Sequence, residues 1–407
     1  MGRSSIARRR AGAIVLVIAV VGLVWLLLAG GSDPDPGAEE AAQGGEPAAP
    51  ARKPAPASAD LPAEDLVDQL LLVGFEGDDP SGDLTEEIED RAYGGVLIGQ
   101  ANWDGAARGE KLIDSIRKAG AKGVGMAPLV ATIQEGGPYR SLPDLPPEDA
   151  AIEIGDRGDP RVAEDWGEDL GKGLAGVGID LNLGPVADVA TLDSPIAGRA
   201  FSVDPTVTAE LTGAAVRGCE KAGIACAVSH FPGLGAAAQD TDLGPATVGL
   251  DPTTLRSRDL PPFLAAIDAG APAVVVSHSL YSAYDSVSPA SLQPEIVTGL
   301  LRDELGFDGV AISDDIGAGA IEAVSRPADA AVEAVNAGID LVQVADPKDV
   351  EPVREALLAA VDDGTLSEQR LQEAASRVLA LKREVVRNGR SKKAPRRSAS
   401  PRRPSRG

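Results

Sequence analysis

Short apolar runs alternate with longer amphipathic stretches along most of this 407-residue chain. The apolar runs have the length of buried strands, and they lie at 95–98, 129–132, 179–183, 224–228, 273–277, 310–313 and 339–344. Stretches with helical spacing of apolar residues follow, at 109–119, 160–176, 206–222, 252–269, 294–305, 350–362 and 367–386. Strict alternation of this kind predicts a parallel sheet whose strands are joined by crossover helices.

The number of strands favours a closed barrel over an open sheet. Seven strands within about 320 residues fit an α/β fold, a single-domain (β/α)8 TIM-type barrel in which one strand is degenerate. Glycines at positions 223, 270 and 338 precede strands, as expected at αβ turns. An open doubly wound sheet is the alternative, but no Gly-rich dinucleotide or phosphate loop follows any predicted strand.

Polar residues collect where the predicted strands end. In barrel enzymes the carboxyl ends of the strands carry the active site. Any one of these residues is also typical of a strand-end cap, but together they predict a site at this face. The residues are Asn182, Asp188, His230, His278, Asp314 and Asp315.

The richest polar loop covers residues 229–242 and reads SHFPGLGAAAQDTD. It follows the apolar run at 224–228 and contains His230, one of only two histidines in the chain. Two acids, Asp240 and Asp242, stand two positions apart near its end. The loop is therefore the main candidate for chemistry.

The N-terminal region predicts a membrane-anchored, extracytoplasmic protein. Residues 1–10 are basic, and the uncharged apolar segment at 11–31 is long enough to span a bilayer as a helix. The basic flank predicts a cytoplasmic N-terminus and a barrel outside the membrane. A cleaved signal peptide, with secretion, is the rival interpretation. Residues 32–61 are rich in Pro, Ala and Gly and predict a disordered linker.

The remainder divides into a predicted barrel domain at 62–386 and a basic, disordered tail at 387–407. Removing the four N-terminal arginines and the nine basic tail residues from the formal net charge of −24 leaves about −37 for residues 11–386. A domain with this much negative charge repels nucleic acid. The basic tail by itself is not sufficient evidence that the protein binds DNA or RNA.

Two cysteines, Cys219 and Cys226, fall in a predicted helix and in the strand that follows it. A helix end and the next strand rarely bring two Cα atoms within bonding distance, so we expect these cysteines to be unpaired. No cluster of cysteine and histidine has zinc-binding spacing, and we expect neither a metal nor a cofactor.

Motifs spread from about residue 65 to residue 382 carry a family resemblance. They are LVGFEG (72–77), QEGG (134–137), GPVADV (184–189), GRAFS (198–202), HFPG (230–233), SH (277–278), PASL (289–292), LGFDGVAISDD (305–315) and NAGID (336–340). In this order they resemble the N-terminal domain of glycoside hydrolase family 3, in particular its single-domain β-N-acetylglucosaminidase branch.

The resemblance implies a retaining glycosidase acting on β-linked sugars such as cell-wall glycan fragments. It implies that Asp314 is the nucleophile and that Asp315 is a cap or supporting acceptor. Arg199, His230, Asp188 and His278 are the implied sugar contacts. Trp103 and Tyr139 are candidates for an aromatic platform under the sugar, or for ordinary packing.

The chain differs from the family pattern at the position of the general acid and at several sugar-binding positions. The branch reads Lys-His-Phe-Pro-Gly-His-Gly followed by Asp-Ser-His, and here the lysine is Ser229, the second histidine is Leu234 and the catalytic histidine is Asp242. The substrate-binding aspartate before QEGG is Ile133, and the arginine after it is Pro138. These replacements should weaken the recognition of hydroxyl groups.

Two interpretations of Asp242 follow. Either Asp242 is the acid, with a pKa raised by burial and by neighbouring Asp240, or the loop is solvated and Asp242 only caps a turn. The first predicts a retaining exo-β-glycosidase of the β-N-acetylhexosaminidase or β-glucosidase type. The alternative is a catalytically impaired, membrane-anchored barrel that binds glycan or a partner protein.

Overall fold

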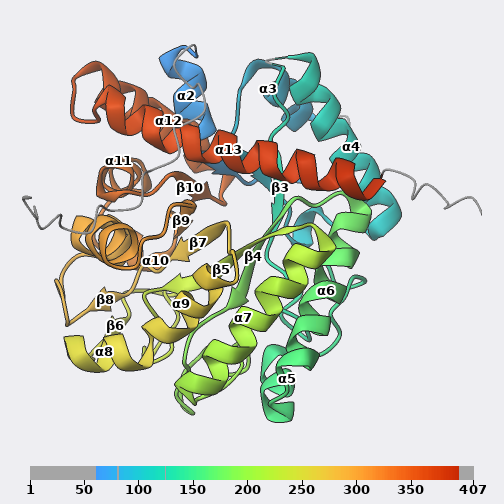
Figure 1. Ribbon diagram of the computed structural model, residues 1–407. Coiled ribbons are helices and arrows are strands. Elements are labelled where there is room, and N and C mark those ends of the chain that lie inside the picture. The colour runs from blue at the N-terminus through green and yellow to red at the C-terminus, as the bar shows by residue number, and fades with distance from the viewer. Residues whose placement is uncertain (1–60, 80–81, 124, 394–407) are drawn as a thin grey trace, which may run out of the picture. The chain divides into compact units, whose positions relative to one another are not determined.

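The computed structural model describes residues 61–79, 82–123 and 125–393. Eight parallel strands form a closed barrel in the order β1-β10-β9-β7-β5-β4-β3-β2, with helices around it (Figure 1). The strands are β1 (Leu71–Val73), β2 (Gly95–Leu97), β3 (Leu129–Thr132), β4 (Leu181–Val186), β5 (Ala225–Phe231), β7 (Ala273–Val276), β9 (Val310–Asp315) and β10 (Leu341–Val344). A separate two-stranded ribbon pairs β6 (Thr247–Val248) with β8 (Leu280–Tyr281). The predicted barrel is confirmed.

The strand that the hydrophobic pattern failed to separate is β1. It has three residues and begins two positions after α2 (Ala63–Gln69), so its apolar residues read as a continuation of that helix. It is nevertheless the strand that closes the barrel, because it pairs with both β10 and β2.

The helices match the amphipathic stretches of the sequence. The described α-helices are α2, α3 (Asp83–Asp90), α4 (Ala106–Lys122), α5 (Ala151–Arg157), α6 (Pro160–Val177), α7 (Pro205–Ala222), α8 (Pro252–Arg258), α9 (Leu260–Asp268), α10 (Gly319–Glu322), α11 (Pro327–Ala337), α12 (Pro347–Asp362) and α13 (Glu368–Lys393). Short 3-10 turns lie at Gln100–Asn102 and Ala290–Leu292, and a wider π-type helix spans Glu295–Glu304.

One predicted helix, at 252–269, is divided. It breaks into α8 and α9 at Asp259, just before the prolines at 261 and 262. Proline lacks the N–H needed inside a helix and clashes with the preceding turn, but it is accepted in a first turn. A new helix therefore begins at this point.

The final helix, α13, covers the N-terminal end of the barrel (Figure 1). Its residues Val378, Leu381 and Val385 join the inward-facing side chains of the strands in one apolar cluster. Access to the barrel interior is thereby blocked at this end. The opposite end, where the strands finish, is the open one.

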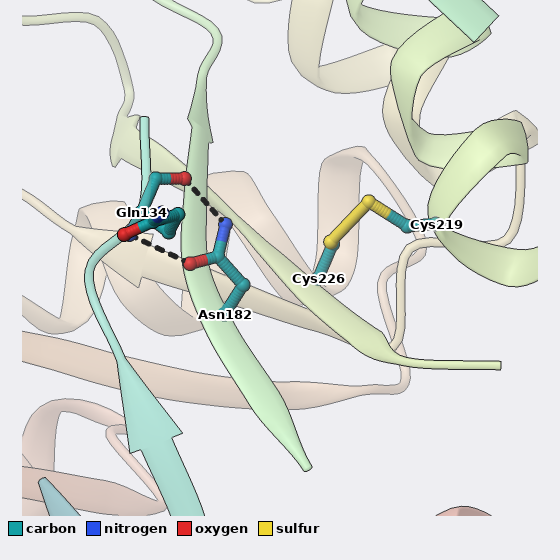
Figure 2. The surroundings of a disulfide bond; sticks show 4 residues. All are labelled: Gln134, Asn182, Cys219 and Cys226. Carbon is teal, nitrogen blue, oxygen red and sulfur yellow. Dashed lines mark hydrogen bonds between the residues drawn. A yellow bond between two sulfur atoms is a disulfide. The ribbon is translucent and has the colours of Figure 1, made fainter. Parts of the chain in front are cut away.

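Cys219 and Cys226 form a disulfide, so the expectation of unpaired cysteines was wrong (Figure 2). The chain reverses tightly after α7, where the N–H of Ile224 donates to the carbonyl of Cys219. Cys226 occupies an outward-facing position of β5, between the inward-facing Ala225 and Ala227. The side chain therefore faces α7, and the two Cα atoms lie 6.3 Å apart.

Several predictions concern the ends of the chain. The predicted anchor at 11–31, the basic residues 1–10 and all but the last residue of the 32–61 linker lie outside the described residues. Within the described ranges, no helix has the length and apolar character needed to cross a membrane. Helix α13 continues to Lys393, so the first residues of the predicted basic tail are helical, whereas residues 394–407 lie outside the description.

Candidate active site

A cavity of about 340 Å³ opens at the carboxyl ends of the barrel strands. This is the volume of a site for a small ligand. Its lining combines apolar side chains with carboxylates and other polar groups that come from most of the strand ends. The lining residues are Leu97, Ile133, Glu135, Leu183, Arg199, Ser229, His230, Asp240, Asp242, Val275, Asp314, Asp315, Gly317, Ala318, Gln343 and Ala345.

Asp314 and Asp315 end strand β9 and have different environments. Asp315 accepts hydrogen bonds from the N–H groups of Ala345 (3.0 Å) and Gly317 (3.3 Å), which ties β9 to β10. Asp314 accepts one from the N–H of Asp315 (3.0 Å). The supporting role expected for Asp315 agrees with these contacts. Asp314 keeps a carboxylate oxygen available in the cavity.

Asp242 lines the same cavity and is exposed to solvent. Removal of water by the surrounding chain raises the pKa of this carboxyl to about 6, and the negative charges of Asp314 and Asp240 add to that effect. Arg199 and His230 oppose the shift. A carboxyl with this pKa is partly protonated near neutral pH, as a general acid must be.

Backbone contacts fix the loop that carries Asp242. The carbonyls of Thr241 and Asp242 accept hydrogen bonds from the N–H groups of Ala320 (2.9 Å) and Gly319 (3.1 Å) at the start of α10. A Cβ at Gly319 would lie 2.9 Å from the carbonyl oxygen of Asp242, closer than real side chains approach. The acid loop therefore rests directly on the segment that follows Asp314.

Asp240 supports the same loop from the other side. Its carboxylate accepts the N–H of Asp242 (3.1 Å) and lies 3.7 Å from the guanidinium of Arg199. No hydrogen bond within the described residues uses the carboxyl of Asp242 as a turn cap. The contacts thus give no support to the capping role, whereas the exposure of Asp242 and Leu243 agrees with a partly solvated loop.

Arg199 forms the centre of a charged network. It makes two hydrogen bonds, of 2.7 and 2.8 Å, to the carboxylate of Glu135, which is 3 % exposed. Burial opposes the charge of Arg199, but Glu135 and Asp240 outweigh it and raise the pKa of the guanidinium. The arginine is therefore a fixed cation on the cavity wall.

His230 continues this network into the protein. Its Nδ1 lies 2.7 Å from a carboxylate oxygen of Asp188, and its Nε2 lies 3.4 Å from a guanidinium nitrogen of Arg199. Burial lowers the pKa of His230, but the carboxylate of Asp188 outweighs it and raises the pKa. Asp188 orients the ring, so the other ring nitrogen faces Arg199 and the cavity.

Three of the predicted strand-end residues do not line the cavity. Asp188 is fully buried and also accepts the N–H of Leu234 (2.6 Å). His278 is fully buried, with Nδ1 2.7 Å from the hydroxyl of Ser291 and Nε2 2.9 Å from the carbonyl of Asp315. Both ring nitrogens of His278 therefore have protein partners. These contacts favour a structural role for His278 over sugar binding.

Asn182 ties β4 to the residue after β3. Its amide accepts the N–H of Gln134 (2.8 Å) and donates to the carbonyl of the same residue (3.0 Å), as Figure 2 shows. The pairing holds Glu135, the next residue along the chain, at the cavity wall. Asn182 thus positions the site without facing it.

The sequence reasoning missed Glu135 and Gln343 as site residues. Both follow the rule that polar residues at strand ends face the site, because Glu135 comes soon after β3 and Gln343 lies on β10. The proposed aromatic platform is not among the cavity residues. Trp103 donates from its indole to Asp144 (2.5 Å) and packs against Gly109, and Tyr139 lies beside Gly198. The contacts of Trp103 favour packing, whereas Tyr139 is 39 % exposed.

No group of three or more histidine, cysteine or acidic side chains in the described ranges is arranged to hold a metal ion. The groups that the cavity offers are carboxylates, one guanidinium, an imidazole edge, a hydroxyl and an amide. Such a set suits the recognition of a hydroxylated ligand together with acid–base and nucleophilic chemistry.

Comparisons with known proteins agree with the fold and the motifs. The β-hexosaminidase of Stenotrophomonas maltophilia (strain K279a) is 33% identical over 300 residues, which cover 71% of this chain and 86% of that relative. A solved β-N-acetylhexosaminidase from Beutenbergia cavernae DSM 12333 matches with a TM-score of 0.69 and 34% identity, covering 80% of this chain and 99% of that one.

A second solved structure is a glycoside hydrolase family 3 β-N-acetylglucosaminidase from Paenibacillus sp. str. FPU-7. It matches with a TM-score of 0.78 and 32% identity, and the match covers 80% of this chain but only 63% of that one. Residues 63–381 match the glycosyl hydrolase family 3 N terminal domain. The chain therefore belongs to glycosyl hydrolase family 3.

Proposed function

We propose that this protein is a retaining β-glycosidase of the β-N-acetylhexosaminidase type, with Asp314 as nucleophile and Asp242 as general acid and base. The observation that carries the proposal is that both carboxyls line one cavity while their environments differ. Asp314 ends a strand and accepts an N–H, whereas Asp242 has a pKa raised to about 6. A nucleophilic carboxyl and a second carboxyl that can carry a proton near neutral pH are what a retaining mechanism requires.

In the first step, an oxygen of Asp314 forms a bond to the anomeric carbon as the glycosidic C–O bond breaks. The departing oxygen keeps that electron pair and takes the proton of Asp242. In the second step, water attacks the anomeric carbon and gives a proton to the Asp242 carboxylate. As the bond to water forms, the bond between the anomeric carbon and the oxygen of Asp314 breaks, and its electron pair returns to the Asp314 carboxylate.

The remaining site residues hold the substrate and the acid in place. Arg199, fixed by Glu135, is positioned to donate to a sugar hydroxyl or an acyl carbonyl, and it also attracts Asp240. His230, oriented by Asp188, presents its second ring nitrogen toward the same wall. Support for an N-acetylhexosamine as the sugar comes from the names of the relatives and from the family membership.

The test uses aryl β-N-acetylglucosaminides and aryl β-glucosides with good and poor leaving groups. A leaving group that needs protonation depends on Asp242, so kcat/KM should fall steeply with leaving-group pKa in Asp242→Ala but only weakly in the parent. A 5-fluoro glycosyl fluoride should label Asp314, and mass spectrometry of the peptides locates the adduct.

Asp314→Ala is the matched control, since it should give neither turnover nor adduct. Absence of turnover and labelling in the parent, together with measurable sugar binding, would favour the catalytically impaired glycan-binding barrel. Labelling of a carboxyl other than Asp314 would contradict the assigned nucleophile.

For location, we propose a single-pass membrane protein anchored by residues 11–31, with the barrel outside the cytoplasm and acting on envelope glycans. The proposal rests on the apolar segment with its basic N-terminal flank. The Cys219–Cys226 disulfide supports it, because such bonds persist in oxidising compartments.

Fractionation tests the location. The full chain should stay with membranes after alkaline carbonate washing, and its barrel should be digested by protease added to spheroplasts. Release of a shortened chain into the medium would favour the cleaved signal peptide instead.

A further inference from the structure

Gln343 presents its side-chain amide to the cavity, and no described residue bonds to this amide. Leu341, two residues earlier on β10, belongs to the apolar cluster inside the barrel, so Gln343 also points inward. The residue is 4 % exposed and lines the cavity. Its backbone N–H donates to Ser313 (3.0 Å), but its amide group bonds to none of the described residues.

Ser229 has a similar position on β5. Ala225 and Ala227 face the barrel interior, and Ser229 continues this inward face to the cavity. The residue is 2 % exposed, and its hydroxyl oxygen is buried without a partner in the described structure. Rotation about its Cα–Cβ bond is enough to redirect this small group.

Unpaired polar groups in such places require an explanation. For the hydroxyl of Ser229, burial without a partner costs about 1–3 kcal/mol, and native structures contain few such groups. The amide of Gln343 instead opens into the cavity and is free to bind a ligand there. In the barrel order β10-β9-β7-β5, strand β9 with Asp314 lies between the two strands that carry Gln343 and Ser229. Both unpaired groups therefore lie beside the position of the sugar that Asp314 attacks.

The polar groups of the opposite wall, Glu135 and Arg199, are charged and already paired with each other. Leu97, Ile133 and Leu183, from the β2–β4 side of the barrel, contribute apolar side chains to the cavity. Hydroxyl groups of a bound sugar therefore find uncommitted neutral partners on the side of β5 and β10.

We infer that the amide of Gln343 and the hydroxyl of Ser229 bind hydroxyl groups of the non-reducing sugar and so set the specificity of this site. This inference rests on the proposed glycosidase function. It assigns as substrate an uncharged pyranoside with free hydroxyls at the positions that face β5 and β10. A sugar carboxylate is excluded, because Asp240, Asp242, Asp314 and Glu135 already place negative charge around the cavity.

The test compares Gln343→Leu and Ser229→Ala with the parent protein. Ser229→Ala removes a buried unpaired hydroxyl, and Gln343→Leu removes an amide that makes no bond within the described structure, so neither variant should lose free energy of unfolding in urea. The KM for an aryl β-glycoside should nevertheless rise about 5- to 30-fold, the loss expected for one hydrogen bond to a ligand. Binding should thus weaken without a loss of stability.

Monodeoxy substrates identify the hydroxyl concerned. For each variant, one deoxy analogue should have the same KM with parent and variant, because the partner of the removed group is missing from both complexes. Ser279→Ala is the matched control, since the hydroxyl of Ser279 is also buried without a partner but does not line the cavity. It should likewise cause no loss of stability, and it should leave KM unchanged.

The inference is overturned if the variants lose stability while KM stays unchanged, or if no deoxy analogue removes the difference between parent and variant. Calorimetric measurement of N-acetylglucosamine and glucose binding distinguishes a failure of this inference from a failure of the proposed glycosidase function. If the parent cleaves no glycoside but binds a monosaccharide that Gln343→Leu binds more weakly, only the hydrolase proposal fails. If the parent neither cleaves nor binds, both fail.

Discussion

The two ends of the barrel treat charged and polar groups in opposite ways. At the N-terminal end, the buried carboxylate of Asp340 is bound by Arg302 (2.6 Å), Arg370 (2.8 Å) and Arg377 (3.1 Å). Burial would raise the pKa of Asp340, but the three guanidinium groups lower it. At the C-terminal end, the pKa of Asp242 is raised, the hydroxyl of Ser229 is buried without a partner, and the amide of Gln343 faces the cavity with no bond to a described residue.

The difference separates groups that hold the fold together from groups that await a ligand. Two of the arginines at the N-terminal end come from α13, so the cluster fastens the last helix across the barrel. The one buried carboxylate of this cluster is bound by protein cations, as a buried carboxylate must be. The polar groups of the cavity that lack hydrogen-bond partners reduce the stability of the free protein. They gain partners when substrate binds. Variants at the two ends should therefore affect different measurements.

The largest effect is expected for Asp242→Ala. Loss of the general acid should lower kcat/KM about 10²- to 10⁴-fold for a phenyl glycoside, with little change in the free energy of unfolding. Added azide should restore turnover of an activated glycoside by attacking the glycosyl-enzyme without a general base. Full activity of this variant would show that the proton comes from another group.

The pH dependence of the parent tests the same residue. The acid must be protonated, so kcat/KM for a poor leaving group should fall as pH rises through about 6. Asp240→Asn removes a negative charge that raises the pKa of Asp242, so this fall should move to lower pH. A fall that stays at the same pH would contradict the coupling of the two acids.

The next largest effect is a loss of stability at the N-terminal end of the barrel. Asp340→Asn leaves three buried or partly buried guanidinium groups without a carboxylate, and it should cost about 3–5 kcal/mol of unfolding free energy in urea. The folded fraction should keep the parental kcat. A loss below about 1 kcal/mol would show that the cluster does not fasten α13.

A smaller, local effect is expected where the acid loop meets α10. A Cβ in Gly319→Ala must push away the backbone of Asp242, Leu243 and Gly244, so kcat should fall about 10- to 100-fold while the protein stays folded. The drop should be steeper for poor leaving groups than for activated ones. Gly176→Ala is the control, because nothing lies within 4 Å of its added Cβ.

The smallest expected effect is a change in how the free energy of unfolding varies with pH. Burial lowers the pKa of Lys382, on α13, to about 7, although its ammonium donates to Gln69 and to the carbonyl of Tyr93 (both 2.8 Å). The unfolded chain then holds more protons between pH 7 and 10, so the unfolding free energy should rise with pH there, by at most about 1.4 kcal/mol per unit. Lys382→Met should flatten this rise, and an unchanged slope would count against the shift.

Much of the fold could be predicted because its signals are local. Alternating apolar runs and amphipathic stretches indicated the barrel and seven of its strands, and β1 was missed only because its short apolar run joins that of α2. The disulfide was missed for a different reason. Its formation depends on the sharp return of the chain after α7 and on the direction in which Cys226 points.

The candidate site, too, could be predicted only in part from the sequence. The rule that polar residues at strand ends face the site placed Asp314 and the Asp240–Asp242 loop in one region, and the cavity contains all three. The same rule included Asp188 and His278, which lie deeper and bond to protein groups. Whether a strand-end residue faces the cavity or the surrounding chain depends on neighbouring strands, which no local pattern records.

By itself, the sequence determined the family, the barrel and the identity of the acid-loop residues, because periodicity and motifs belong to contiguous segments. Tertiary structure alone decided that Asp242 is a raised-pKa carboxyl near Asp314, that Arg199 is engaged by Glu135, and that Gln343 lacks a partner. Each of these properties arises from groups on different strands or loops. Their distance and their access to water are set only when the barrel closes.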